Sequence, residues 1–185
     1  MSHPEEGTGK TAVLRINQCA LALLCLLFIF SGCRKQGAPV APVAPKEIAS
    51  SDQVVKAFSH FIPSASPPAS IELVISPGFH INANPATFPY LIATEVQPGQ
   101  ADGITVVGKL AYPLPKMETF AFADQPLAVY EGNVTIPIPL KADAGAQGQR
   151  TIPFKIRVQA CDSQQCYPPA TLDASLPIDP AALKR

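Results

Sequence analysis

The sequence predicts an all-β domain, an antiparallel β-sandwich of immunoglobulin type. Three observations predict this fold. Strand-length apolar runs recur between clusters of Pro, Gly and Asp, and helical periodicity of any length is absent. The chain from residue 51 to residue 185 has the size of one domain. Many short strands with regular turn signals are typical of such sandwiches.

We expect six of these runs to be strands: Val54–Phe61, Ser70–Ser76, Ile104–Tyr112, Val134–Leu140, Thr151–Ala160 and Thr171–Ile178. The second run alternates apolar and polar residues, as does a strand with one buried face. Pro137, Pro139 and Pro153 fall inside the later runs. Because proline donates no ladder hydrogen bond, we expect them at sheet edges or bulges.

Residues 1–32 are predicted to be a signal peptide of the lipoprotein type. Their apolar run, Cys19–Phe30, is too short to span a bilayer comfortably and has the length of a signal-peptide core. The next residues, Ser31-Gly32-Cys33, resemble a bacterial lipobox, so Cys33 would be lipidated and anchor the chain to a membrane. An ordinary cleaved signal and an uncleaved anchor stay open. All three export the domain to an oxidising space, where disulfides persist.

Residues 33–50 are predicted to be the lipidated cysteine and a spacer. Residues 37–45 read GAPVAPVAP, and alternating Pro and Ala favour an extended chain without a packed core. Arg34, the residue after Cys33, is not an inner-membrane retention signal of the enterobacterial kind. Its identity therefore favours the outer membrane. The chain has 14 basic and 14 acidic residues, so no net charge argues for nucleic acid or anionic lipid as a partner.

Two cysteines, Cys161 and Cys166, remain outside the leader and its lipobox, and four residues lie between them. Closing a ring of about six residues stabilises a fold by only about 2 kcal/mol, at the low end for disulfides. The pair is therefore a weak structural staple and is better placed to exchange electrons. A purely structural bridge stays open as the alternative.

The surroundings of the pair predict a slow nucleophile. Pro168 and Pro169 exclude a helix after Cys166, so no helix N-terminus can stabilise a thiolate there. Asp162 adjoins Cys161, and a nearby carboxylate disfavours thiolate formation. Such a domain would act with a partner that brings an activated thiolate, or would deliver electrons to a strongly oxidising partner.

A zinc site is the competing interpretation of the two cysteines, with His60 or His80 as a further ligand. Both histidines are isolated in the sequence, so we expect no metal and no other cofactor. We expect His60 to be a strand residue beside Phe61 and His80 to lie at the edge of a turn. Hydrolase, metalloprotease and phosphate-binding motifs are absent from the sequence.

Four stretches, in order, carry a family resemblance. Residues 158–169 (VQACDSQQCYPP) resemble the active-site hairpin of the N-terminal domain family of the thiol:disulfide interchange protein DsbD. Pro77–Asn84 is similar to a turn of that family. Leu110–Pro113 precedes a variable loop, as in the family, and Val129–Ile136 is similar to one of its strand entries. The resemblance covers nearly the whole domain after the spacer.

The resemblance implies an immunoglobulin-like fold and a periplasmic shuttle. Such a domain takes reducing equivalents from a thioredoxin-like domain and passes them to thioredoxin-fold partners. Cys166 corresponds to the cysteine that forms mixed disulfides, and Cys161 to the one that resolves them. Asp162, Tyr167 and His80 flank the pair. The implied activity is of the protein-disulfide reductase or thiol-disulfide interchange type, and the non-enzymatic alternative stays open.

A loop that carries an aromatic side chain shields the cysteines in that family. Here the loop would be residues 113–126, with Phe122 as the first candidate for the shielding ring and Phe120 as the second. The same rings could instead dock a partner, because exposed aromatics often anchor interfaces.

The sequence also departs from the family. The membrane electron carrier and the C-terminal thioredoxin domain of DsbD do not follow Arg185, and the cysteine spacing is one residue shorter than in well-known members. We therefore expect a stand-alone lipoprotein that works with a separately encoded membrane carrier. The alternative is a non-catalytic binding or assembly lipoprotein with an inert disulfide.

Overall fold

The computed structural model describes residues 47–184. The predicted signal peptide, the lipidated Cys33 and residues 33–46 of the predicted spacer lie outside them. None of the helices in residues 47–184 is long and apolar enough to cross a membrane. The elements are, in order, η1 (Ser51–Gln53), β1 (Val55–Phe61), β2 (Ala69–Ile75), β3 (His80–Asn82), β4 (Glu95–Pro98), β5 (Ile104–Val106), β6 (Lys116–Glu118), β7 (Leu127–Tyr130), β8 (Asn133–Ile138), β9 (Leu140–Ala142), β10 (Arg150–Val158), β11 (Ala160–Cys161), β12 (Ala170–Ile178) and η2 (Pro180–Lys184).

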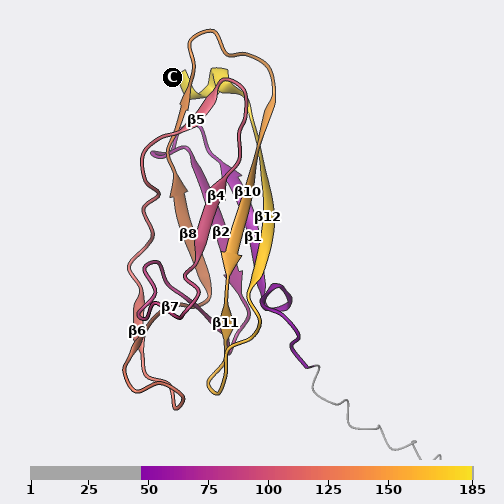
Figure 1. The fold of residues 1–185 in the computed structure, drawn as a ribbon. Coiled ribbons are helices and arrows are strands. Elements are labelled where there is room, and N and C mark those ends of the chain that lie inside the picture. The colour runs from indigo at the N-terminus through magenta and orange to yellow at the C-terminus, as the bar shows by residue number, and fades with distance from the viewer. Residues whose placement is uncertain (1–46, 185) are drawn as a thin grey trace, which may run out of the picture. The chain divides into compact units, whose positions relative to one another are not determined.

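The strands form four sheets, and every pairing between strands is antiparallel. Two three-stranded sheets, in the orders β1-β2-β8 and β12-β10-β4, make the body of the domain. A four-stranded sheet of short strands, β11-β3-β7-β6, occupies one end and is called the smaller sheet below (Figure 1). The β5-β9 pair lies toward the other end with the C-terminal η2 (Figure 1). This arrangement confirms the predicted all-β, antiparallel fold.

The core lies between the two larger sheets. β2 and β10 alternate buried and more exposed residues along their length, which is the period of two expected of strands with one buried face. A single cluster of buried side chains contains residues of both sheets, among them Ile71, Leu73, Phe154 and Ile156. Fully burying each such side chain contributes about 1.5–3 kcal/mol, so this contact between the sheets holds the sandwich together.

Two predicted strands are shorter than expected. The run Ile104–Tyr112 is a strand only as far as Val106, and Gly108 follows with φ at +71°, in the left-handed region that ends a strand. The run Val134–Leu140 divides at Pro139, between β8 and β9. Strands β3, β4, β6 and β7 were not expected, because runs of three or four residues are too short to show a period of two.

Two prolines within strands differ in their position in the sheets. Pro137 is on β8, which is an edge strand of its sheet. Pro153 lies on the central strand β10, but β4 ends opposite Phe154 at Pro98. Beyond that end, the Gly99 N–H still donates to the Pro153 carbonyl oxygen at 2.7 Å, and proline has no N–H to return the bond. The central strand β10 therefore lacks one hydrogen bond at Pro153, which does not lie on an edge strand as expected.

Candidate functional site

The two cysteines lie on a hairpin at the end of the sandwich that carries β6, β7 and β11 (Figure 1). β10 ends at Val158, β11 carries the chain to Cys161, and the loop Asp162–Gln165 returns it to Cys166. β11 pairs with β3, so the smaller sheet supports the hairpin from one side.

Cys161 and Cys166 form a disulfide, with 3.9 Å between their Cα atoms. They face each other across the hairpin as a non-hydrogen-bonded antiparallel pair, so the ladder hydrogen bonds are made by the residues on either side of them. The flanking backbone bonds are Tyr167 N–H to the Ala160 carbonyl oxygen at 2.8 Å and Asp162 N–H to the Gln165 carbonyl oxygen at 2.9 Å. These bonds hold the two strands of the hairpin together independently of the sulfur–sulfur bond.

The two cysteines differ in exposure. Cys161 has no accessible surface, whereas Cys166 is half-buried. Cys166 borders a surface hollow that is also lined by Ile48, Ala49 and Tyr167. A molecule in solution can therefore approach the bridge from the side of Cys166.

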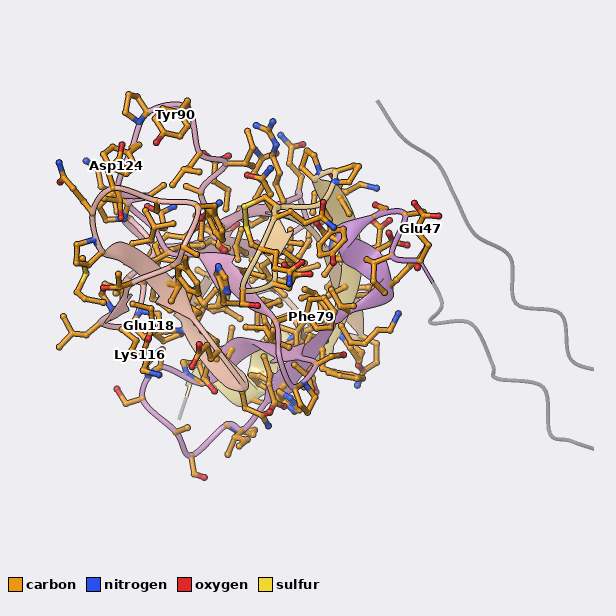
Figure 2. All side chains as sticks on the ribbon, turned by 90° about the horizontal axis from the view of Figure 1, so that it is seen from below. Glu47, Phe79, Tyr90, Lys116, Glu118 and Asp124 are labelled. Carbon is orange, nitrogen blue, oxygen red and sulfur yellow. A yellow bond between two sulfur atoms is a disulfide. The ribbon has the colours of Figure 1, made fainter. Side chains whose placement is uncertain are left out.

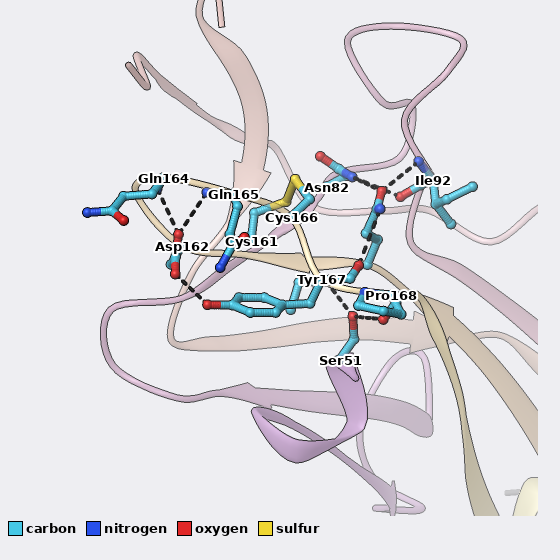
Figure 3. The surroundings of a disulfide bond; sticks show 12 residues. Ser51, Asn82, Ile92, Cys161, Asp162, Gln164, Gln165, Cys166, Tyr167 and Pro168 are labelled. Carbon is cyan, nitrogen blue, oxygen red and sulfur yellow. Dashed lines mark hydrogen bonds between the residues drawn. A yellow bond between two sulfur atoms is a disulfide. The ribbon is translucent and has the colours of Figure 1, made fainter. Parts of the chain in front are cut away.

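Asp162 orders the loop between the cysteines. One carboxylate oxygen accepts hydrogen bonds from the Gln164 and Gln165 N–H groups at 2.7 and 2.9 Å, and the other accepts from the Tyr167 hydroxyl (Figure 3). The Tyr167 hydrogen bond is the main cause that lowers the pKa of Asp162, and the two backbone donors add to it. The same contact raises the pKa of Tyr167.

His80 follows directly after a turn, as expected, but it is also a buried strand residue, which was not expected. The turn ends at Phe79, and His80 is the first residue of β3, where it is 2% exposed and pairs in register with Cys161. Facing residues of antiparallel strands project from the same side of a sheet, so the ring lies beside the buried cysteine. Burial is the largest effect on the pKa of His80 and lowers it, while Glu131, Asp162 and Glu118 act in the opposite direction.

The predicted shielding loop contains β6 and so is not irregular throughout. Phe120 stacks on the His80 ring, with 4.0 Å between centroids, and Phe122 stacks on the outer side of Phe120 at 5.3 Å. Phe122 is 40% exposed, whereas Phe120 is half-buried. Phe120 is thus the ring in contact with the surroundings of the cysteines, and Phe122 is one ring further out. Whether either ring shields the disulfide stays a prediction.

Comparison with known proteins decides the family. The sequence model described as "Thiol:disulfide interchange protein DsbD, N-terminal" matches residues 47–177, which is more than half of the chain and includes both cysteines. The chain belongs to this family. No curated protein matches it.

Two solved structures resemble this chain. The reduced DsbD N-terminal domain of Neisseria meningitidis is 14% identical, with a TM-score of 0.44; the match covers 69% of this chain and 86% of that one. The N-terminal periplasmic domain of ScsB from Proteus mirabilis is 18% identical, with a TM-score of 0.41; the match covers 69% of this chain and 45% of that one.

The sequence did not reveal the polar contacts that position the cysteine hairpin. The Gln159 side-chain oxygen accepts from the Asn82 amide and from the Ile92 N–H, and its amide donates to the Tyr167 carbonyl oxygen (Figure 3). The available signal was the position of Gln159 in the cysteine motif, where a polar residue follows a buried strand. Ser51 donates to the Pro168 carbonyl oxygen and accepts from the Ala160 N–H at 2.9 Å. No sequence signal links residues 109 apart.

The histidines do not join the cysteines in a metal cluster. Among the described residues, no three or more His, Cys, Asp or Glu side chains are placed to hold a metal ion. His60 lies on β1 beside Phe61, as expected, and its Nε2 is 2.8 Å from the Glu72 carboxylate.

Proposed function

We propose that this chain is a periplasmic thiol-disulfide exchange module. It passes reducing equivalents between thioredoxin-like proteins through the Cys161–Cys166 pair. The observation that carries the proposal is the unequal exposure of the two sulfurs on an end hairpin: Cys161 is fully buried and Cys166 borders a hollow. Membership of the DsbD N-terminal family supports it.

The proposed cycle assigns different roles to the two cysteines. When the oxidised domain is reduced, a donor thiolate attacks the Cys166 sulfur, the intramolecular bridge breaks, and Cys161 leaves as the thiolate. A second donor thiol then resolves the mixed disulfide, which leaves the domain as a dithiol and the donor as a disulfide. When the domain reduces a recipient, Cys166 attacks first and Cys161 displaces the recipient's thiolate.

The hairpin geometry supports exchange over stapling. Because backbone hydrogen bonds flank the pair on both sides, the strands remain joined when the bridge opens. Closing so small a ring contributes only about 2 kcal/mol. The alternative, a binding or assembly lipoprotein with an inert bridge, draws on the complete burial of Cys161, which limits access to one of the two sulfurs.

The location and the partners belong to the same proposal. The leader, residues 1–32, would export the chain, and lipidated Cys33 would anchor it in a membrane, with the outer membrane favoured. Residues 33–50 would then act as the spacer and residues 51–185 as the redox domain. Electrons would come from a separately encoded membrane carrier of DsbD type and go to thioredoxin-fold proteins of the periplasm.

A trapping experiment tests the roles of the cysteines. In a full-length chain with Cys19, Cys25 and Cys33 changed to serine, reduced Cys161→Ala is mixed with a purified thioredoxin-fold protein in its disulfide form. We expect a mixed disulfide through Cys166 to accumulate, because the resolving thiol is missing. Cys166→Ala is the matched control. Trapping by Cys166→Ala alone would reverse the roles, and trapping by neither variant would contradict exchange.

A further inference from the structure

His80 is a titratable side chain that is buried directly beside the cysteine pair. It faces Cys161 across the β3–β11 pairing and is 2% exposed. Within residues 47–184, its Nε2 atom has no hydrogen-bond partner. Burying a polar atom without a partner is unfavourable, and an imidazole nitrogen without a partner is free to accept a proton.

The proposed cycle creates a need for a proton acceptor at Cys161. After Cys166 has formed a mixed disulfide, Cys161 must attack as a thiolate, yet it has no accessible surface from which water could take its proton. Burial disfavours the charged thiolate, and the carboxylate of the adjoining Asp162 disfavours it as well. A thiol in this place reacts slowly unless a neighbouring base accepts its proton.

Asp162 is the rival base, because it adjoins Cys161 in the chain. Its carboxylate already accepts from the Gln164 N–H, the Gln165 N–H and the Tyr167 hydroxyl, and these bonds lower its pKa. His80 is the better acceptor, since its nitrogen is uncommitted and its ring is on the same face as Cys161.

The surroundings of His80 allow its ring to accept a proton and to release it again. Burial favours the neutral ring, which can accept a proton, and the carboxylates of Glu118, Glu131 and Asp162 stabilise the ring once it is charged. Lys116 contacts both Glu118 and Glu131 on the side of β6. Phe120 stacks on the imidazole and fixes its plane.

We propose that His80 is the base that accepts the Cys161 proton when the mixed disulfide at Cys166 is resolved. The inference rests on the proposed function. In the step, the Cys161 S–H proton moves to His80 Nε2, and the Cys161 thiolate attacks the Cys166 sulfur. The Cys161–Cys166 bond forms, and the bond from Cys166 to the partner breaks. The partner leaves as a thiolate with the bonding electron pair, and the proton passes from His80 to it or to solvent.

The test follows resolution separately from attack. The reduced full-length chain, with Cys19, Cys25 and Cys33 changed to serine, is mixed with one equivalent of dithionitrobenzoate, a chromogenic aromatic disulfide. Attack by Cys166 releases the first coloured thiolate, and resolution by Cys161 releases the second at a rate that does not depend on reagent concentration. The variant is His80→Gln, the matched control is the exposed strand histidine variant His60→Gln, and Cys161→Ser marks the loss of the second release.

We expect His80→Gln to leave the first release within about twofold and to slow the second about a hundredfold near neutral pH, the usual scale of general-base catalysis. In the parent chain, the second release should rise with pH as the His80 ring loses its proton and then level off. In His80→Gln it should keep rising about tenfold per pH unit with the thiolate fraction, whereas His60→Gln should match the parent.

Three other outcomes are informative. Equal rates and equal pH profiles in His80→Gln and the parent would overturn the role of His80 and leave the exchange function standing. A parent chain that shows no second release would contradict the exchange function itself. If His80→Gln does not fold, the parent decides: the midpoint of its pH profile should coincide with the His80 ring titration seen by NMR, and a rise without inflection would overturn the inference.

Discussion

Tyr167 donates a hydrogen bond from its hydroxyl to the carboxylate of Asp162, across the loop that joins the two cysteines. The contact ties the residue that follows Cys166 to the residue that follows Cys161 (Figure 3). The loop is therefore held by this bond and by the backbone donors of Gln164 and Gln165, as well as by the disulfide.

Tyr167→Phe should raise the pKa of Asp162 toward its ordinary value, because the tyrosine hydrogen bond is the main cause that lowers it. The pKa should stay somewhat low, since the two backbone donors remain. NMR titration of the Asp162 carboxyl carbon measures the change. Tyr90→Phe is the control, because Tyr90 is 74% exposed and projects from the rim of this end (Figure 2). An unchanged Asp162 pKa in Tyr167→Phe would contradict the contact.

The same contact gives stability a defined pH dependence. Since folding lowers the pKa of Asp162, its contribution is complete above the unfolded value, about 3.9, and is lost as pH falls through the folded value. The free energy of unfolding of Tyr167→Phe should thus differ from that of the parent at neutral pH and converge with it in acid. Urea unfolding at several pH values measures this, and a difference that persists after Asp162 is protonated would argue against it.

Ser51→Ala should destabilise the domain by about 1–3 kcal/mol, because it leaves the buried Ala160 N–H without a partner next to Cys161. Urea unfolding of the full-length chain measures the loss. Ser64→Ala, in the exposed loop between β1 and β2, is the matched control and should change the free energy of unfolding by less than about 0.5 kcal/mol. Equal effects of the two substitutions would show that the Ser51 contact does not hold the hairpin.

Phe120→Ala should speed reduction of the bridge by a small thiol by up to about tenfold. A tenfold change corresponds to about 1.4 kcal/mol of activation free energy. Phe120 stacks directly on His80, which faces Cys161, so its removal should expose that side of the disulfide. Phe122 contacts Phe120 and lies one ring further from His80. Phe122→Ala should have the smaller effect, and Tyr90→Ala none. The measurement is the pseudo-first-order rate with dithiothreitol.

A different pattern would assign these rings to docking. If both phenylalanine variants keep the parent rate with the small thiol but trap thioredoxin-fold proteins less efficiently, the rings bind the partner and do not shield the disulfide.

Reduction of the bridge should lower the free energy of unfolding by only about 2 kcal/mol, the value expected for a ring of about six residues. The flanking backbone hydrogen bonds remain in place when the sulfurs separate. Urea unfolding of the oxidised chain and of the Cys161→Ser, Cys166→Ser double variant measures the difference. A loss of 4 kcal/mol or more, toward the upper end of the range for disulfides, would favour a structural bridge.

The sequence predicted what depends on local pattern. The long strands β1, β2, β10 and β12 were placed within a residue or two, because each buries one face and shows it in the alternation of residues. The family was recognised from the residues around Cys161 and Cys166, where closely spaced motif residues carry the signal.

What the sequence missed depends on contacts between distant residues. The sequence places His80 at the edge of a turn, and only the pairing of β3 with β11 shows that it faces Cys161. Ser51 gave no signal, because its partners Ala160 and Pro168 lie more than a hundred residues away. The order of Phe120 and Phe122 above His80 depends on how the chain turns between β6 and β7, which local pattern does not set.

The reduction potential of the Cys161–Cys166 pair tests the central claim most directly. It is measured on the full-length chain, with its three leader cysteines changed to serine, by thiol trapping across a glutathione and dithiothreitol series. An exchange module should give a value clearly above about −300 mV, where bridges are labile. A value well below about −300 mV is the mark of a structural disulfide, and it would contradict the shuttle and leave a binding module with an inert bridge.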